Sequence, residues 1–421
     1  MKTNLICMAM IAFIAMPARA EPALTIDQAA RLAVENQPLL DGLAARSRAA
    51  SDAAIAARQL PDPQLVAGIV DLPIDTADAG SMSRDSDTQM QLALMQEFPR
   101  ADKRRLRGEI ESQRALGYDA EHHLTERSIR RDASLAWLEL WRNQQLLGLA
   151  RATQREAGIQ VQAVEIALKA GRAPQAELLS ARVEAGRGLD AVAGAEQSIN
   201  HARYLLSRWI GDAAFLPVAE ELPQAPPLPP LEPMMARIKT HPHLAALRTE
   251  VAEAQRLAEL ARAAYAPDWR VEVGYAHRQA YSEEVTLKVG IDLPVFAHQR
   301  QDRGLAGALA QQQAAEYAVD DGLRQLEAEA RLNHHDWLRL GERLQNYDDS
   351  LLPQSQNRID AALTAWRSGS GPLTQLLDAR RAALELQTMR LDLQTDAIKH
   401  YIQLRYLGAY DAMPGSAEIQ P

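Results

Sequence analysis

Residues 269–275 and 285–291 alternate strictly between apolar and polar side chains. A period of two residues is typical of a β-strand with one apolar and one polar face. In the first half of the chain, residues 89–94 alternate in the same way, and residues 64–70 do so less clearly. A polar stretch separates the two segments of each half, so the pattern predicts two β-hairpins.

The two predicted hairpins have apolar faces and no obvious helix to cover them. An isolated hairpin is marginal in water, whereas about ten alternating residues per strand suit an outer-membrane barrel. Trp269, Tyr275 and Tyr281 are the candidate aromatic residues at the membrane interface. Four strands cannot close around a lumen, and open strand edges are not tolerated in lipid. We therefore expect a membrane β-barrel that is shared between several chains.

Long helices are expected after each hairpin. The segment from Ala101 to Lys169 contains no proline and is rich in Ala, Leu, Glu, Gln and Arg. It predicts one helix of about 69 residues, on the order of 100 Å long. A second helix is predicted from Pro174 to Trp209, and the second half repeats the pair from Gln301 to Trp366 and from Pro372 to Leu407. Antiparallel helices of this length are typical of the wall of a tube.

A further helix is expected before each hairpin. In the first half, Thr25 is a suitable N-cap for a helix that runs to about Leu60, where Pro61 stops it. In the second half, the equivalent helix is expected from about Pro233 to Ala266, stopped by Pro267.

Paired sequence landmarks show that the two halves are a tandem duplication. Ala136–Leu140 resembles Asp336–Leu340, and Tyr204–Gly211 resembles Tyr401–Gly408. Further matches occur in the same order, with an offset that drifts by only a few residues. Helices rich in Ala and Leu resemble one another by composition, but paired Trp, Gly and Pro positions do not arise in that way.

The first twenty residues have the features of a signal peptide cleaved after Ala20. Lys2 is followed by an apolar run from Leu5 to Met16 and by the small-x-small sequence Ala18-Arg19-Ala20. We therefore expect the following organisation: signal peptide 1–20, first repeat 21–216, proline-rich connector 217–233, second repeat 234–410 and a flexible tail 411–421.

Composition excludes several classes of function. The chain has 46 Lys and Arg against 55 Asp and Glu, a net charge of −9, which argues against nucleic acid as a partner. Its one cysteine, Cys7, lies in the predicted signal peptide, so the mature chain is expected to form no disulfide of its own. The sequence has no Gly-rich phosphate loop and no nucleophile elbow, so we expect neither an enzyme nor a cofactor.

The duplication, the hairpins and the Gly-x-x-Pro turns together resemble the TolC family of outer-membrane efflux proteins. The resemblance covers nearly the whole mature chain and implies a mainly α-helical fold with duplicated long helical hairpins. It further implies a homotrimer in the outer membrane, with a twelve-stranded β-barrel that continues into a helical tunnel in the periplasm. The implied partners are outer-membrane lipid, a periplasmic adaptor (membrane fusion) protein and an inner-membrane pump of the RND class.

Residues Gln96–Arg100, followed by Lys103-Arg104-Arg105, resemble the branch that serves heavy-metal efflux, including cobalt-zinc-cadmium and copper-silver systems. This resemblance implies a passive conduit for metal cations. Export of drugs or other small molecules stays an alternative, because a basic cluster at a helix start also occurs in family members that export organic compounds. A periplasmic coiled-coil adaptor is a second alternative. The basic side chains are expected to contact phospholipid head groups or solvent.

The resemblance places the periplasmic tip, where the tunnel narrows and the pump assembly docks, at the two turns between the long helices. The turn residues are Gly171, Pro174, Gly369, Gly371 and Pro372. One gate carboxylate of the family is matched by Asp378, whereas the other position is Gln375. The equivalent of Gln375 in the first repeat is Glu177. These three residues are either gate residues or ordinary solvated helix positions.

Two histidine pairs invite a metal-site interpretation. His122-His123 and His334-His335 are adjacent in sequence, so the two side chains of each pair point about 100° apart on a helix. Neither pair has the i, i+4 spacing that directs two imidazoles to one ion. We therefore expect no dedicated metal site.

Overall fold

The computed structural model describes residues 23–409 except 36, 76, 223–226 and 280. The predicted signal peptide and C-terminal tail lie outside these residues, as does part of the predicted connector. Within the described residues, none of the helices combines the length and hydrophobicity that a membrane crossing requires.

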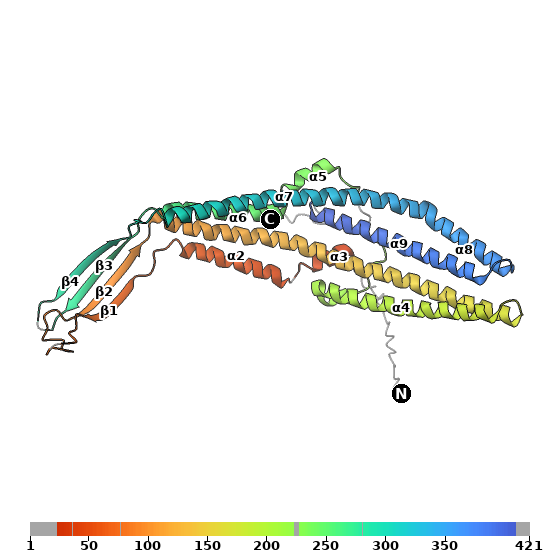
Figure 1. Ribbon diagram of the computed structural model, residues 1–421, viewed down its shortest axis with the longest axis horizontal. Helices are drawn as coiled ribbons and strands as arrows, with labels where there is room; N and C mark the ends of the chain where they lie inside the picture. The colour runs from red at the N-terminus through yellow and green to blue at the C-terminus, as the bar shows by residue number, and fades with distance from the viewer. Residues whose placement is uncertain (1–22, 36, 76, 223–226, 280, 410–421) are drawn as a thin grey trace, which may run out of the picture. The chain divides into compact units, whose positions relative to one another are not determined.

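The two predicted β-hairpins are present and form one sheet (Figure 1). The strands β1 (Gln64–Val70), β2 (Gln89–Phe98), β3 (Trp269–His277) and β4 (Glu284–Ile291) are all antiparallel, in the order β1-β2-β3-β4. Residues Phe98 and Trp269 are register partners, and their rings stack with centroids 4.4 Å apart. The central pair β2–β3 therefore joins the two sequence repeats. The alternation within each strand does not predict this pairing between the hairpins.

The helix before each hairpin is broken, so the prediction of one continuous helix is wrong in both halves. The first half has α1 (Ile26–Leu32) and α2 (Pro38–Ala56), and the second has α5 (Leu231–Ile238) and α6 (Pro242–Ala263). Both later helices begin at a proline. A proline disfavours the helical conformation of the residue before it, and Gln37 and His241 are indeed extended, with ψ of 107° and 139°.

The long helices match their predicted bounds closely. They are α3 (Ala101–Lys169), α4 (Gln175–Ile210), α7 (Gln301–Asn346), α8 (Leu352–Arg367) and α9 (Leu373–Tyr406). A short 3-10 turn, η1 (Gly211–Phe215), follows α4.

The helix predicted from Gln301 to Trp366 contains one irregularity. A π-turn, η2 (Tyr347–Leu351), separates α7 from α8. Pro353 is the second residue of α8; it has no N–H to donate to the carbonyl of Asp349, and its ring crowds that carbonyl. The wider π-turn accommodates the proline without ending the helix.

The chain divides into two compact units that do not coincide with the sequence repeats. The first unit contains residues up to 32, 133–224 and 352–395, and the second contains 33–132, 225–351 and 396 onward. Each unit thus takes equivalent elements from both halves. In the first unit, the buried indole of Trp137 donates a hydrogen bond to the carbonyl of Leu24 at 2.9 Å.

The second unit has an apolar core between α5, α6, α7 and the end of α9. Its central side chains include Met234, Ile238, Leu244 and Leu404, all fully buried. His241 lies beside this core and is only 2% exposed. Its Nδ1 accepts a hydrogen bond from the His243 backbone N–H at 3.2 Å, which fixes the ring as the Nε2–H tautomer. Nε2 therefore donates to the Tyr406 carbonyl at 3.0 Å.

The same unit joins the sheet to α3 through a partly buried ion pair. Lys103 is 7% exposed, and its Nζ donates to Asp268 Oδ2 at 2.8 Å and to the Ala266 carbonyl at 2.7 Å. The backbone N–H of Arg100 donates to the other oxygen of Asp268 at 2.9 Å. The expectation that Lys103 contacts head groups or solvent is therefore wrong, because this side chain ties the start of α3 to the start of β3.

His241 predicts a specific dependence of stability on pH. Burial lowers the pKa of His241 from 6.5 to about 4 in the folded protein. Between about pH 6.5 and pH 4, His241 is therefore protonated in the unfolded chain but neutral in the folded chain. Stability is lost as the pH falls through this range. The loss attributable to this side chain is on the order of 3 kcal/mol at most.

Replacement of His241 by Asn keeps a side-chain acceptor at the N-cap, with an amide oxygen in place of the ring nitrogen Nδ1, but removes the titration. Urea unfolding at pH 7 and pH 4.5 should therefore show a smaller acid-induced loss of stability in His241→Asn than in the parent protein. Equal losses in the two proteins would contradict a buried neutral histidine.

Candidate functional site

The candidate site consists of the two turns that join the long helices of the first unit. In the first turn, Gly171 has φ of +68° and its N–H donates to the Leu168 carbonyl at 2.9 Å. In the second turn, Gly369 has φ of +76° and its N–H donates to the Trp366 carbonyl at 3.1 Å. Left-handed backbone of this kind favours glycine. The two turns are thus built alike, as the repeat predicts.

A proline ends each turn. Pro174 occupies the position directly before α4, with φ of −77° and ψ of 156°, and Pro372 directly precedes α9. The prediction placed these prolines in the first helical turn; they lie one position earlier. Proline suits this position as well. A backbone N–H at the start of a helix has no acceptor within the helix, so the missing N–H of proline costs no hydrogen bond, and its fixed φ is compatible with the backbone there.

An apolar cluster holds the two helical hairpins together behind the turns. It contains the end of α3, the start of α4, the end of α8 and the start of α9 (Figure 1). The buried members are Val164, Leu178, Ala181, Leu373, Leu376 and Leu377. The motif Leu-Leu-x-Ala-Arg, which the sequence repeats after each turn, therefore supplies the core of this end of the unit.

Glu177 is half-buried and faces the other hairpin. Its Oε2 lies 3.4 Å from the indole Nε1 of Trp366, which donates a long hydrogen bond from the end of α8 to the start of α4. Trp366 itself packs against the apolar cluster. Glu177 is thus part of a contact between the repeats and differs from a simple solvated position.

Asp378 and Gln375 are exposed on α9. The side chain of Asp378 is 59% exposed, and its Oδ1 lies 3.5 Å from Nη1 of Arg381 one turn further on. Arg381 also pairs with Glu184 of α4, with Nη2 and Oε1 3.1 Å apart. The three predicted residues therefore lie near the same end of the unit but have different partners. The structure joins Asp378 to Glu184 through one shared guanidinium.

Two further ion pairs cross between the hairpins and were not predicted. The guanidinium of Arg142 on α3 donates to Asp392 of α9 through Nε at 2.8 Å and Nη2 at 2.6 Å. Arg380 of α9 lies 4.0 Å from Glu156 of α3. Any movement of one hairpin past the other within this unit must break these contacts, which lie deeper in the unit than the turns.

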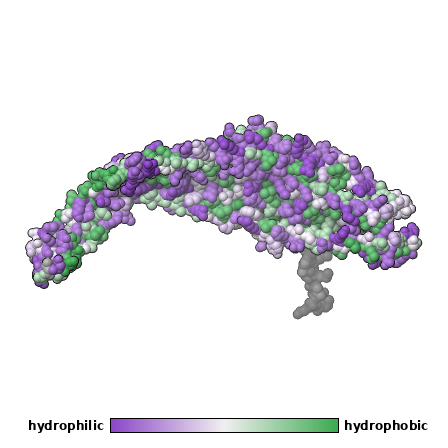
Figure 2. Space-filling model, in the orientation of Figure 1, coloured by the Kyte–Doolittle hydropathy of each residue, from purple (hydrophilic) through white to green (hydrophobic). Residues whose placement is uncertain are grey.

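The predicted interface aromatics lie along the sheet of the second unit. Trp269 is the first residue of β3, Tyr275 lies near its end and Tyr281 lies in the loop before β4. All three are exposed, and so are the large apolar residues of β4, with Val285 76% and Leu287 70% exposed. Figure 2 shows hydrophobic side chains at the surface of the strand region. Such a surface needs a partner or an apolar solvent.

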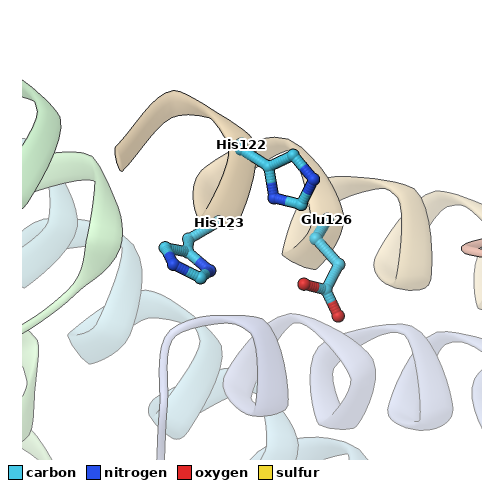
Figure 3. Close-up of side chains that lie close together, drawn as sticks. All are labelled: His122, His123 and Glu126. Carbon is cyan, nitrogen blue, oxygen red and sulfur yellow. The ribbon is translucent and has the colours of Figure 1, made fainter. Parts of the chain in front are cut away.

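One group of residues among those described has ligand atoms close enough to hold a metal ion. His122, His123 and Glu126 of α3 each offer one ligand atom within 4.8 Å of the others (Figure 3). Sequence reasoning missed this group because it considered the spacing of the two imidazoles alone. The available signal was a carboxylate three and four residues after the pair.

Comparisons with known proteins agree with this architecture. Residues 237–408 match the family described as "Outer membrane efflux protein". No match was found among curated protein sequences.

Several solved structures have the same fold. CusC matches with a TM-score of 0.78 and 18% identity over 92% of both chains. VceC of Vibrio cholerae matches with a TM-score of 0.74 and 18% identity, covering 91% of this chain and 96% of that one. The CmeC outer membrane channel of Campylobacter jejuni matches with a TM-score of 0.75 and 12% identity, covering 97% of this chain and 94% of that one. At these identities the likeness establishes the fold, which confirms the predicted fold class.

Proposed function

We propose that this chain, whose residues 237–408 match the outer membrane efflux protein family, is the outer-membrane channel of a tripartite efflux system. It is a non-enzymatic transport protein. In this function the chain is a passive conduit from the periplasm, or from an inner-membrane pump, to the exterior.

The sheet is the observation that carries the proposal. Within the described residues, β1 and β4 pair with one neighbour each, so each leaves one edge of backbone N–H and C=O groups without a strand partner. Their apolar side chains are also exposed. Three copies placed edge to edge close a barrel of twelve strands, in which every strand has two neighbours and the apolar side chains contact lipid. In a soluble adaptor the apolar side chains of this sheet would be exposed to water, which is unfavourable.

Under this proposal the helical turns of the first unit form the periplasmic tip. Gly171, Pro174, Gly369, Gly371 and Pro372 then make the surface on which a periplasmic adaptor and an RND pump dock. The close similarity of the two turns supports this role, because a trimer then presents six nearly equivalent turns to its partners. The mature chain begins after Ala20, and its strands lie in the outer membrane.

Glu177 and Asp378 form the gate in this proposal, and Gln375 occupies the position of the family's other gate carboxylate. The contacts of Trp366 with Glu177 and of Arg381 with Asp378 and Glu184 hold the two hairpins in their present arrangement. In a trimer each carboxylate occurs three times around the axis, and a ring of carboxylates attracts cations.

Heavy-metal cations are the cargo that we propose. The resemblance of Gln96–Arg100 to the metal-efflux branch and the acidic residues near the tip support it. The adjacent basic residue Lys103 supports it less, because its charge is used in the ion pair with Asp268. Export of drugs or other small molecules is the alternative that the experiment below separates.

Removal of the two gate carboxylates should open the tip and weaken its hold on cations. The double substitution Glu177→Ala, Asp378→Ala is expected to raise single-channel conductance in planar bilayers. The divalent-cation concentration that half-blocks the channel should rise roughly tenfold, equivalent to about 1.4 kcal/mol. Glu342→Ala, which removes an exposed carboxylate of the second unit, serves as the control. Unchanged conductance and block in the double variant would exclude these residues as the gate.

The cargo is tested by growth of a deletion strain on two panels, one of metal ions and one of hydrophobic drugs. Metal efflux predicts sensitivity confined to metals, restored by the intact gene. Sensitivity confined to drugs would assign the chain to general export and contradict the proposed cargo, while leaving the channel itself intact.

A further inference from the structure

We propose that α3 carries a binding site for a divalent transition-metal ion, formed by His122, His123 and Glu126. Figure 3 shows the three side chains on one short stretch of this helix. The site is independent of the proposed cargo, because it rests only on the positions of these side chains.

The positions of the three residues around the helix explain why they meet. Successive residues are separated by about 100°, so His123 lies about 100° from His122 and Glu126 lies about 40° from His122. Glu126 therefore projects between the two histidines, one turn further along the helix. It is four residues after His122 and three after His123, the two spacings at which helical side chains contact each other.

The distances fit a site that closes on a metal ion by rotation of side chains. The three ligand atoms lie within 4.8 Å of one another, and the two imidazole rings are nearly perpendicular with centroids 5.8 Å apart. Metal–ligand bonds of about 2.0–2.2 Å require the ligand atoms to approach to roughly 3–4 Å. His123 is exposed and the other two are half-buried, so the side chains have room to make this adjustment.

Arg130 competes with the metal for Glu126. Its Nη2 and Nε donate to Oε1 of Glu126 at 2.8 and 3.1 Å. A bound cation must therefore use the second carboxylate oxygen or displace the guanidinium. Because the guanidinium also repels a metal ion by its charge, removal of Arg130 should strengthen binding.

The ligand chemistry selects the kind of metal. Two imidazoles and one carboxylate suit Cu²⁺, Zn²⁺ and Ni²⁺, whereas Mg²⁺ and Ca²⁺ prefer sites made of oxygen alone. Of these ions, Cu²⁺ is expected to bind most tightly. Three protein ligands leave a coordination position open for water.

The chain itself offers a matched control. His334 and His335 are a second adjacent pair on a long helix, but Leu338 occupies the position that corresponds to Glu126. The chain thus has two adjacent histidine pairs, and only the first pair has a carboxylate at the position between the two imidazoles.

Calorimetric titration of the detergent-solubilised full chain with Cu²⁺ tests the proposal. The protein is purified without a polyhistidine tag and is treated with a chelator beforehand. The parent protein should bind one ion per chain at this site. His123→Gln and Glu126→Gln should each weaken binding at least tenfold, and Arg130→Gln should tighten it severalfold. The double variant His334→Gln, His335→Gln should bind as the parent does. Circular dichroism confirms that each variant is folded.

Electron paramagnetic resonance of the bound Cu²⁺ provides a second readout. The parent spectrum should show coupling to two imidazole nitrogens, and His123→Gln should show coupling to one. Absence of Cu²⁺ binding by the parent at millimolar concentration would overturn the proposal. So would unchanged binding in His123→Gln, or loss of binding in the control variant. None of these results depends on which substrate the channel exports.

Discussion

The backbone groups at the two edges of the four-stranded sheet are the constraint on which the rest of the structure depends. β1 and β4 each have one edge without a strand partner among the described residues, and both expose large apolar side chains. In lipid, each unsatisfied N–H or C=O costs several kcal/mol. The sheet is therefore stable in a membrane only when its edges pair with other copies of the chain. The oligomer, the shared barrel and the conduit that we propose all rest on this requirement.

The helices next to the sheet are fixed by contacts that begin at its ends. Lys103 and Asp268 join the start of α3 to the start of β3, although they are far apart in sequence. Phe98 stacks on Trp269 at the same end of the sheet. These contacts hold the first helical turn of α3 in a defined relation to the strands of both repeats. The second unit thus combines the sheet and the adjoining helices in one packed body.

Elements whose cause is local were predicted well. The absence of proline from Ala101 to Lys169 gave the bounds of α3, and strict alternation gave β3 and β4. The errors occurred where one proline changes the backbone of its neighbours. Pro38 and Pro242 break helices that composition alone extends, and Pro353 introduces a π-turn where a regular helix was expected.

The turns of the candidate site were also predictable, because glycine and proline act through their own backbone. The contacts of the candidate gate residues were not predictable, since Trp366 lies 189 residues from Glu177 in sequence. A single sequence holds no signal for a contact of that separation. The group of His122, His123 and Glu126 was overlooked for another reason. Its three residues are close in sequence, but only the spacing of the two histidines was considered, and the carboxylate between them was not.

Cross-linking between strand edges tests the shared barrel most directly. The mature chain is expected to lack cysteine, so one cysteine can be placed at Val66 of β1 and a second at Val285, Leu287 or Val289 of β4 in turn. Within one chain these edges lie about 14 Å apart, too far for a disulfide. If the barrel is shared, oxidation of membranes should give disulfide-linked dimers and trimers for at least one pair and for none of the single variants. Folded, membrane-inserted protein that stays monomeric for every pair would contradict the account.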